Sequence, residues 1–285
     1  MRDELADRFE AHRGHLRAVA HRMLGSLPEA EDAVQETWLR LRRVDADEVD
    51  NLAAWLRTVV SRVCLDVLRR RREVPVDQVP DAPSADDGPE TEAVLAESVG
   101  LALLVVLDTL APAERVAFVL HDAFAVPFDR IAPIVGRSTA TTKKLASRAR
   151  QKVRGATALP DAELTRHRRV VDAFLTAARA GDFDALLAVL DPDVVRRADP
   201  AALPPGAPAE VRGAQAVAAE TVVLTANARH AEPALVDGSV GIVVAPRGRL
   251  RFAITVTVRG DRIAAYEVVA DPSRLRRLTL AALLS

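Results

Sequence analysis

The sequence of 285 residues has a single cysteine, only three lysines and few aromatic residues, which make up 4% of the chain. One cysteine excludes an internal disulfide and a zinc site built on cysteines, and the apolar neighbours of Cys64 predict a buried structural thiol. No stretch approaches the ~18 consecutive apolar residues of a membrane-spanning helix, and the charged first residues lack the apolar segment of a signal peptide. We therefore expect a cytoplasmic protein that contacts no membrane.

The length suits two or three domains, and the composition indicates where they divide. Residues 74–93 contain four prolines, six acidic residues and no basic residue, which predicts a flexible acidic linker. A second joint is predicted at Gly155–Asp161, where a helical pattern stops at glycine and resumes after proline. The predicted blocks are therefore residues 1–73, 94–155 and 162–285.

Hydrophobic periodicity predicts that the first two blocks are helical. In the first block the predicted helices are 5–24, a segment from Pro28 through Leu41, and a segment from Trp55 through Arg72. In the second block they are 99–110, 112–121, 128–135 and 138–153. Both blocks should therefore be all-α.

The third block changes from helical to strand periodicity, which predicts an α+β domain. Helices are expected at 162–180 and 183–190, and strands at 240–245, 250–260 and 262–270. Within 250–260 the apolar residues alternate with polar ones, as in a half-buried strand. The connection from Arg259 to Arg262 suits a hairpin turn, and a last amphipathic helix is expected at 273–284.

The segment from Phe128 to Arg154 contains all three lysines, has seven basic residues after Val135, and has no acid after Asp129. Two short helices joined at Gly136 are typical of a helix-turn-helix. In the second helix an inward stripe is predicted at Leu145, Ala149 and Val153, and a stripe along the phosphate backbone at Lys144, Arg148 and Lys152. Residues near its N-terminus, where base edges are contacted, are Thr139, Thr141 and Lys143. The alternative is a solvated basic helix without a ligand, and the absence of acids argues against it.

A second charged surface is predicted on the helix that begins at Pro28. Three polar side chains share one exposed face, opposite Val34, Trp38 and Leu41; they are Asp32, Gln35 and Glu36. An ordinary solvated helix face explains this pattern as well as a docking surface does.

Three segments, in this order, resemble the extracytoplasmic-function group of bacterial sigma factors: EDAVQETWLRL (31–41), NLAAWLRTVVSRVCLDVLRRRR (51–72) and PFDRIAPIVGRSTATTKKLASRARQKVR (127–154). The resemblance implies that the first segment docks on the clamp helices of RNA polymerase, that the second, with the loop 44–53, opens and holds the −10 element, and that the third recognises the −35 element. The polymerase-binding residues it implies are Asp32, Gln35 and Glu36. The DNA-binding residues it implies are Arg57, Arg62, Arg69, Arg70, Arg137, Ser138, Thr139, Thr141, Lys143, Lys144, Arg148 and Lys152.

Residues 163–285 resemble the SnoaL-like, NTF2-like cone, in which a helical hairpin precedes a curved sheet around a pocket. Some members of that fold are enzymes with Asp–His or Tyr–Asp pairs, and the candidates here are Asp172, His167, His230, Tyr266 and Asp193. No spacing joins these residues into an acid–base pair, and a structural role is favoured for each. A subgroup of the sigma factors carries such a cone as a fused regulator, and ADPSRLRRL (270–278) is similar to the signature at the end of that extension.

We therefore predict two all-α sigma domains followed by an α+β NTF2-like cone. The predicted function is that of a sigma factor which binds the clamp helices and flap of core RNA polymerase and promoter DNA, is monomeric when free, and requires no separate anti-sigma factor. No catalytic residue, metal or cofactor is expected. The alternatives are a stand-alone, ligand-sensing helix-turn-helix transcription factor and, less favoured, an NTF2-like enzyme.

Overall fold

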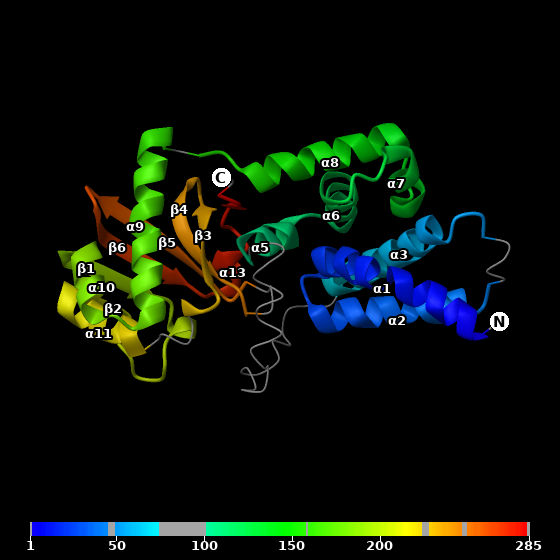
Figure 1. The fold of residues 1–285 in the computed structure, drawn as a ribbon. Helices are drawn as coiled ribbons and strands as arrows, with labels where there is room; N and C mark the ends of the chain where they lie inside the picture. The colour runs from blue at the N-terminus through cyan, green and yellow to red at the C-terminus, as the bar shows by residue number, and fades with distance from the viewer. Residues whose placement is uncertain are drawn as a thin grey trace. The chain divides into compact units, whose positions relative to one another are not determined.

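The computed structural model describes residues 2–44, 49–73, 101–157, 159–223, 228–246 and 250–283 (Figure 1). The predicted linker 74–93 and part of the loop 44–53 lie outside the described residues. Contacts divide the chain into two compact units. One holds the N-terminal helices together with Leu110–Gln151, and the other holds the helix Leu101–Thr109 together with Lys152–Ser285.

Three helices form the N-terminal part of the first unit: α1 (Arg2–Leu24), α2 (Leu27–Leu41) and α3 (Leu52–Glu73). They pack on one another through buried apolar faces, as their periodicity predicts. Ser26 caps α2 by accepting a hydrogen bond from the amide of Glu29 (3.5 Å), and Pro28 occupies the first turn, where no N–H is needed. Cys64 is buried in α3, as predicted, and this burial raises its pKa to about 12.

Among the described residues, four helical segments complete the first unit: α6 (Pro112–Phe118), the π-helix η2 (Val119–Ala123), α7 (Phe128–Val135) and α8 (Thr139–Arg154), whose last three residues belong to the second unit. Gly136 joins α7 to α8 with a φ of +66°, a left-handed conformation that glycine adopts without strain. This connection confirms the predicted helix-turn-helix.

The inward stripe of α8 differs from the predicted one. Leu145 is only half-buried, whereas Thr142 and Ala146 are fully buried together with Ala149 and Val153. Thr142 can occupy a buried position because its hydroxyl donates to the carbonyl of Ser138 (2.9 Å) and needs no other partner. Ala149 and Val153 are therefore buried as predicted, and the prediction was wrong only at Leu145, whose place in the stripe Thr142 and Ala146 take.

The second unit is built, among the described residues, on a seven-stranded sheet with the order β2-β1-β6-β5-β4-β3-β7. Its strands are β1 (Leu190–Ala198), β2 (Glu210–Arg212), β3 (Ala231–Val236), β4 (Ser239–Val244), β5 (Phe252–Arg259), β6 (Arg262–Val269) and β7 (Leu280–Ala281). Neighbouring strands are antiparallel except β1 and β6, which run parallel. Arg259 pairs with Arg262, which confirms the predicted hairpin.

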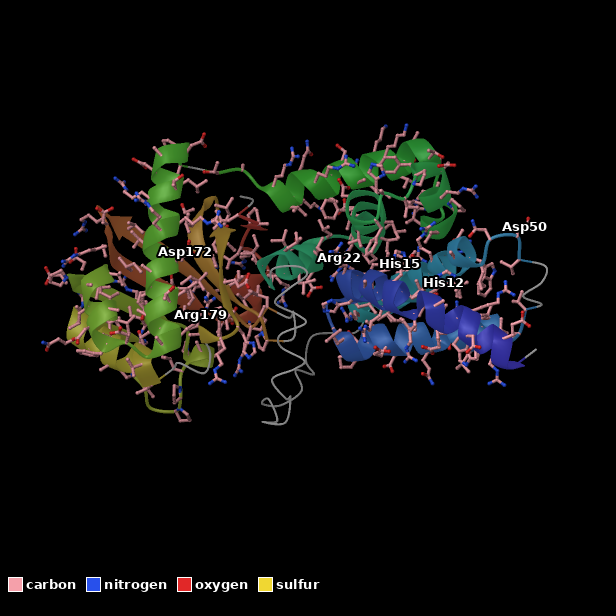
Figure 2. The ribbon with its side chains drawn as sticks, in the orientation of Figure 1. His12, His15, Arg22, Asp50, Asp172 and Arg179 are labelled. Atoms are coloured by element: carbon pink, nitrogen blue, oxygen red, sulfur yellow. The ribbon has the colours of Figure 1, made fainter. Side chains whose placement is uncertain are left out.

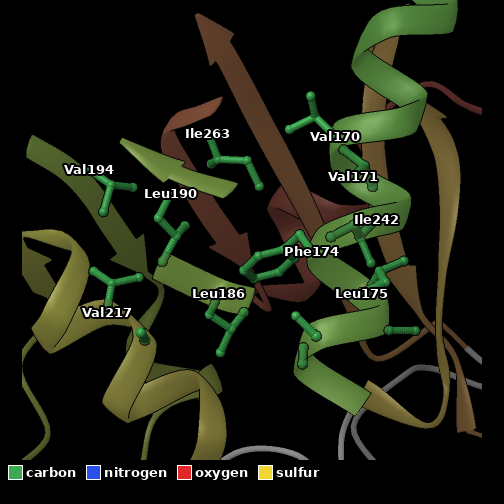
Figure 3. Packing of buried hydrophobic residues seen from close by; sticks show 14 of the residues in the cluster. Val170, Val171, Phe174, Leu175, Leu186, Leu190, Val194, Val217, Ile242 and Ile263 are labelled. Atoms are coloured by element: carbon green, nitrogen blue, oxygen red, sulfur yellow. The ribbon is translucent and has the colours of Figure 1, made fainter. Parts of the chain in front are cut away.

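Helices cover the sheet and complete the core of this unit. They are α9 (Asp161–Ala180), α10 (Phe183–Val189) and α11 (Ala214–Val223), which contact the strands, and α5 (Leu101–Thr109), which contacts β3 and β7. Phe174 and Leu175 of α9 and Leu186 of α10 pack with Ile242 and Ile263 of the sheet (Figure 3). This α+β architecture is that of the predicted NTF2-like cone.

The end of the chain contradicts the predicted helix 273–284. Only a short helix, α13 (Pro272–Leu275), forms there, and Leu280 and Ala281 instead pair with Val236 and Leu235 as strand β7. Pairing with the open edge of β3 satisfies backbone groups that a helix could not reach, and this long-range gain outweighs the local helical pattern.

Candidate nucleic-acid interface

The N-terminus of α8 is held by hydroxyl groups that the sequence predicts to contact DNA. The amide of Thr141 donates to Ser138 Oγ (3.2 Å), and the two hydroxyl oxygens lie 2.9 Å apart. Ser138 is therefore the N-cap of the helix, and Thr141 is its hydrogen-bonded partner. Both side chains remain exposed at the start of the helix, beside Thr139.

The basic residues of α8 lie on its exposed side. Lys143, Lys144 and Arg148 are exposed, and α8 carries no acidic residue along its sixteen positions. Lys144, Arg148 and Lys152 follow one another at a spacing of four, on one flank of the helix. Arg137 precedes the helix, and its guanidinium donates to the carbonyl of Gly136 (3.2 Å). The predicted −35 residues are thus exposed, and the charged ones lie on α8 or directly before it.

The predicted polymerase-binding residues lie on α2 in different electrostatic settings. Asp32 and Gln35 are exposed, and the carboxylate of Asp32 has no ion-pair partner among the described residues. Glu36 accepts a hydrogen bond from Arg40 one turn away (2.8 Å). Asp32 is therefore the more available of the two acids.

A shallow pocket between α1 and α2 adjoins this surface. It has a volume of about 200 Å³, and its lining includes Gln35 and Trp38 of α2 and Phe9 and Arg13 of α1. The rings of Phe9 and Trp38 are 5.0 Å apart, and Arg13 donates to Glu31 (3.2 Å). The sequence analysis missed the part of α1 in this surface; the i, i+4 spacing of Phe9 and Arg13 was the available signal.

The four arginines at the end of α3 divide into exposed and structural residues. Arg71 is tied to the start of α2, because it pairs with Glu29 and donates to the carbonyl of Leu24 (3.0 Å). Arg69 and Arg70 are exposed and contact their own helix at Asp66. The structure therefore leaves Arg69 and Arg70 accessible, as predicted for DNA-binding residues.

Two further arginines of α3 were predicted to contact the −10 strand. Arg57 is half-buried beside His15 of α1, where burial first and the charge of Arg57 second lower the pKa of His15. Arg62 is exposed, and its guanidinium donates to the carbonyl of Pro133 in α7 (3.4 Å). Residues 45–48 of the predicted base-binding loop lie outside the described residues.

The candidate catalytic residues of the cone have structural surroundings. Tyr266 is half-buried, and desolvation of its hydroxyl raises its pKa to about 12; the hydroxyl lies 3.4 Å from that of Thr221. Asp172 lies on the exposed side of α9, with its carboxylate 3.8 Å from Arg168 (Figure 2). Partial burial lowers the pKa of His167 on the same helix. Asp193 is exposed in β1, and His230 precedes β3.

The cone holds a buried ion pair that the sequence analysis missed. Arg196 in β1 is 2% exposed; its Nε donates to Glu220 of α11 (2.9 Å), and its Nη1 donates to the carbonyl of Pro208 (2.9 Å). Such a pair connects a strand, a helix and a loop through bonds of fixed direction. Nothing in the local sequence distinguishes Arg196 from its exposed neighbour Arg197.

The signature-like segment 270–278 meets the loop after β1 within the cone. Asp199, from the loop after β1, accepts hydrogen bonds from the amides of Ala270 and Asp271 (3.0 Å each) and pairs with Arg274. Partial burial alone would raise the pKa of Asp199, but these amide bonds and the guanidinium outweigh it and lower the pKa. The signature-like segment 270–278 is therefore anchored within the cone.

The part of the chain that the structure describes offers neither a metal site nor a membrane-spanning helix. No group of three or more His, Cys, Asp or Glu residues there could hold a metal ion. None of the described helices combines the length and hydropathy needed to span a bilayer.

The sequence matches two families of domain, Sigma-70 region 2 over residues 8–74 and Sigma-70, region 4 over residues 100–153. Across 96% of this chain and 95% of the relative, it is 34% identical to the probable ECF RNA polymerase sigma factor SigI of Mycobacterium tuberculosis. It is 38% identical to the ECF RNA polymerase sigma factor SigJ of the same species, over 93% of this chain and 91% of SigJ. This chain belongs to the ECF RNA polymerase sigma factors.

The crystal structure of the extracytoplasmic function sigma factor SigJ from M. tuberculosis is similar over 95% of this chain and 98% of that one, with 33% identity and a TM-score of 0.47. Membership of the ECF sigma factors confirms the predicted family and function: the chain binds core RNA polymerase and directs promoter-specific initiation of transcription.

Proposed function

We propose that this ECF sigma factor binds the −35 element of its promoters with α8. The observation that carries the proposal is the exposure of Lys143, Lys144 and Arg148 on a helix without acids. Thr139, Thr141 and Lys143 lie near the helix N-terminus, which enters the major groove in helix-turn-helix proteins. The phosphate contacts come from Arg137, Ser138, Lys144, Arg148 and Lys152.

The −10 strand is proposed to bind the exposed end of α3. Arg69 and Arg70 offer charge that no partner helix uses, and Arg57 and Arg62 extend the basic surface along the helix. Single-stranded DNA binds such positive tracks through its backbone. Arg62 must leave the carbonyl of Pro133 to contact a strand, and this exposed hydrogen bond of 3.4 Å is weak enough to exchange.

Core RNA polymerase is proposed to dock on α2 through Asp32, Gln35 and Glu36. Asp32 offers an uncompensated negative charge, while Gln35 stands at the edge of the pocket formed with α1. A negative charge beside a shallow pocket lined by both polar and aromatic side chains suits a partner that inserts one side chain and pairs with one basic group.

The C-terminal cone is proposed to regulate the sigma domains through α5. This helix lies within residues 100–153, which match Sigma-70 region 4, yet it packs on β3 and β7 of the cone. The carboxylate of Glu232 in β3 accepts a hydrogen bond from the amide of Ala102 at the start of α5 (3.4 Å). An element of the DNA-binding domain held by the cone gives the cone a direct influence on that domain.

The same cone also holds the residues at and after the end of α8. The amide of Ala282 donates to the carbonyl of Val153 (2.9 Å), and Gly155 lies against Ala281.

We further propose that this protein works in the cytoplasm without a metal, a cofactor or a catalytic step. It is monomeric when free and needs no separate anti-sigma factor.

Run-off transcription with purified core polymerase tests the proposal. The template is a duplex selected from a randomised promoter library by the full-length protein bound to core polymerase. Lys143→Ala and Arg69→Gln should each reduce the transcript, and Asp32→Ala should reduce binding to core polymerase. Absence of any sequence-specific transcript would overturn the proposal, and tight binding of a palindromic duplex without polymerase would favour a stand-alone transcription factor.

Regulation by the cone is tested in the full-length chain with Gly155→Ala. The new Cβ would lie 2.3 Å from Cβ of Ala281, so the contact with β7 must break. Gly260→Ala is the matched control, because Gly260 has nearly the same φ (+61° against +62°) but open space around it. A changed transcript level with Gly155→Ala alone would support the regulatory role, and equal levels in both variants would contradict it.

A further inference from the structure

One basic residue of α8 is separated from the others by its contacts. Arg150 follows the buried Ala149 and lies one turn after the buried Ala146, on the flank of the helix away from Lys144 and Arg148. Its Nε donates to Oδ1 of Asp122 at 2.7 Å, and the two side chains are only 33% and 29% exposed. The contact joins α8 to the π-helix η2, 28 positions earlier in the chain.

Asp122 is carried by a segment that is held from several directions. The amide of Val126 donates to the carbonyl of Leu120 (2.9 Å), which closes the wide turn around Asp122. The ring of His121 has its Nδ1 3.0 Å from the carbonyl of Val126 and stacks on Phe128 at the start of α7, with ring centres 3.8 Å apart. Asp122 is therefore presented from a defined position relative to the helix-turn-helix.

The next residues attach this segment to the N-terminal helices of the same unit. Phe124 lies against two residues of α1: its ring centre is 5.5 Å from that of His15, edge to face, and 5.2 Å from the guanidinium carbon of Arg22. Figure 2 shows His15 and Arg22 on α1. Ala125 then adopts a φ of +52°, which is uncommon for a residue with a side chain. A local turn with this much support tolerates such strain.

We propose that Asp122 is a positioning residue for recognition of the −35 element, acting through Arg150. This inference rests on the proposed function of α8. The buried stripe of α8 consists mainly of small residues, and these resist rotation of the helix about its axis less than large side chains would. The ion pair at the edge of that stripe supplies a directional contact, and base-edge hydrogen bonds require side chains to be held to within about 0.5 Å.

The direction in which one substitution changes DNA affinity distinguishes a positioning role from a purely electrostatic effect. Asp122 is a carboxylate near a DNA-binding helix, so removing its charge by Asp122→Asn should strengthen binding to phosphates if only electrostatics mattered. If Asp122 positions α8, the same substitution weakens binding to the specific sequence. It should leave binding to unrelated DNA nearly unchanged, because phosphate contacts need less accurate placement.

The experiment measures fluorescence anisotropy of two duplexes with the full-length protein bound to core polymerase. One duplex is selected from a randomised library by the wild-type holoenzyme, and the other has its −35 half scrambled. Asp122→Asn and Arg150→Gln should each lower the ratio of specific to scrambled affinity about threefold to tenfold. The double variant should be no worse than either single variant, because both remove the same contact. Asp122→Glu should retain most of the preference.

Arg148→Gln is the control for the underlying site. Losing a phosphate contact should weaken both duplexes equally and reduce the slope of log affinity against log salt by about one, whereas Asp122→Asn should leave that slope unchanged. If Arg148→Gln changes neither quantity, the proposed function of α8 is wrong, and this inference fails with it. If Arg148→Gln behaves as expected and Asp122→Asn binds as well as the wild type or better, only the positioning role is wrong.

Thermal unfolding of each variant completes the test. A positioning role requires Asp122→Asn to keep an unfolding temperature close to that of the wild type while its sequence preference falls. Loss of both duplexes together with a clearly lower unfolding temperature would mean that the ion pair only supports the fold. That result would also overturn the proposal.

Discussion

The clearest contrast between the two units of this sigma factor is between the basic residues of α8 and the paired arginines of the cone. In the helical unit, Lys144 and Arg148 extend from α8 into solvent with no acid on the same helix. In the cone, Arg196 is buried against Glu220, and Arg274 pairs with both Asp199 and Glu267. Basic residues thus stand exposed on α8, where we propose that they bind DNA, whereas Arg196 and Arg274 form ion pairs within the cone.

The difference teaches how to predict which segment can bind a ligand. The number of basic residues without an internal partner is more informative than the total number of basic residues. Removing one charge of a buried ion pair leaves the other charge buried without a partner, and this lowers stability. Removing a charge that stands in solvent leaves the fold unchanged and affects only what it binds. Four predictions test this comparison, in order of expected size.

The largest effect is expected from Arg196→Ala. It leaves Glu220 partly buried without its partner, so the free energy of unfolding should fall by about 3 kcal/mol. Urea unfolding of the full chain, followed by circular dichroism, measures it. The neighbouring Arg197→Ala is the control, because Arg197 is 57% exposed and should change stability by less than about 0.5 kcal/mol. Equal losses in both variants would remove the contrast between buried, paired charge and exposed charge.

Lys143→Ala should weaken DNA binding without lowering stability, the reverse of the effect expected for Arg196→Ala. Specific binding of promoter DNA should weaken by about 1–3 kcal/mol and sequence preference should relax, while the unfolding temperature stays that of the wild type. Anisotropy titrations with the holoenzyme measure the first quantity and calorimetry the second. Gln151→Ala, at an exposed and uncharged position of the same helix, should bind as the wild type does. A stability loss without a binding loss would show that Lys143 belongs to the scaffold.

Paired and exposed charges can also be compared among the four consecutive arginines at the end of α3. Arg71→Gln breaks the contacts with Glu29 and the carbonyl of Leu24, and should lower the free energy of unfolding by about 1.5 kcal/mol. Arg69→Gln removes only an exposed contact with Asp66 and should stay within about 0.5 kcal/mol. Urea unfolding followed by tryptophan fluorescence is suitable, since Trp38 and Trp55 lie in α2 and α3. If Arg69→Gln proved the more destabilising, the division between exposed and structural arginines would be wrong.

The smallest effect is expected from Asp199→Asn, at about 1 kcal/mol near neutral pH. The pKa of Asp199 is lowered in the folded state, so its ionised form stabilises the cone above the ordinary value of 3.8. That contribution is lost as the pH falls through the lowered value. The free energy of unfolding should therefore fall less steeply between pH 7 and pH 3 in Asp199→Asn than in the wild type. Asp261→Asn, in the β5–β6 turn, is the control; a matching change in that variant would contradict this assignment.

Much of the architecture could be predicted from local pattern. The helices of both sigma domains, the glycine turn at Gly136 and the hairpin at Arg259–Arg262 appear where periodicity and turn chemistry predict them. Strand β1 escaped prediction because Leu190–Ala198 includes Pro192, Asp191 and Asp193, which are unfavourable in strands. It forms because its parallel partner β6 lies more than 60 residues later in the chain, beyond the reach of any local pattern.

The candidate site divides in the same way. The sequence predicts which residues of α2, α3 and α8 carry charge, and the structure shows most of them accessible. Sequence reasoning did not separate Arg150 from the basic residues around it, since its partner Asp122 comes from another helix. It also missed the place of α1 beside Gln35, because a pocket belongs to two helices at once. The assignments of individual residues to polymerase or DNA remain predictions.

By itself, the sequence determined the family, the two helical sigma domains, the α+β cone and the surfaces where charge is concentrated. These follow from periodicity, composition and short motifs, which act over a few turns of chain. Only the tertiary structure decided which charged residues form internal ion pairs, that β7 near the end of the chain pairs with β3, and that α5 packs on the cone. Those outcomes depend on contacts between distant segments, whose energies no local stretch of sequence contains.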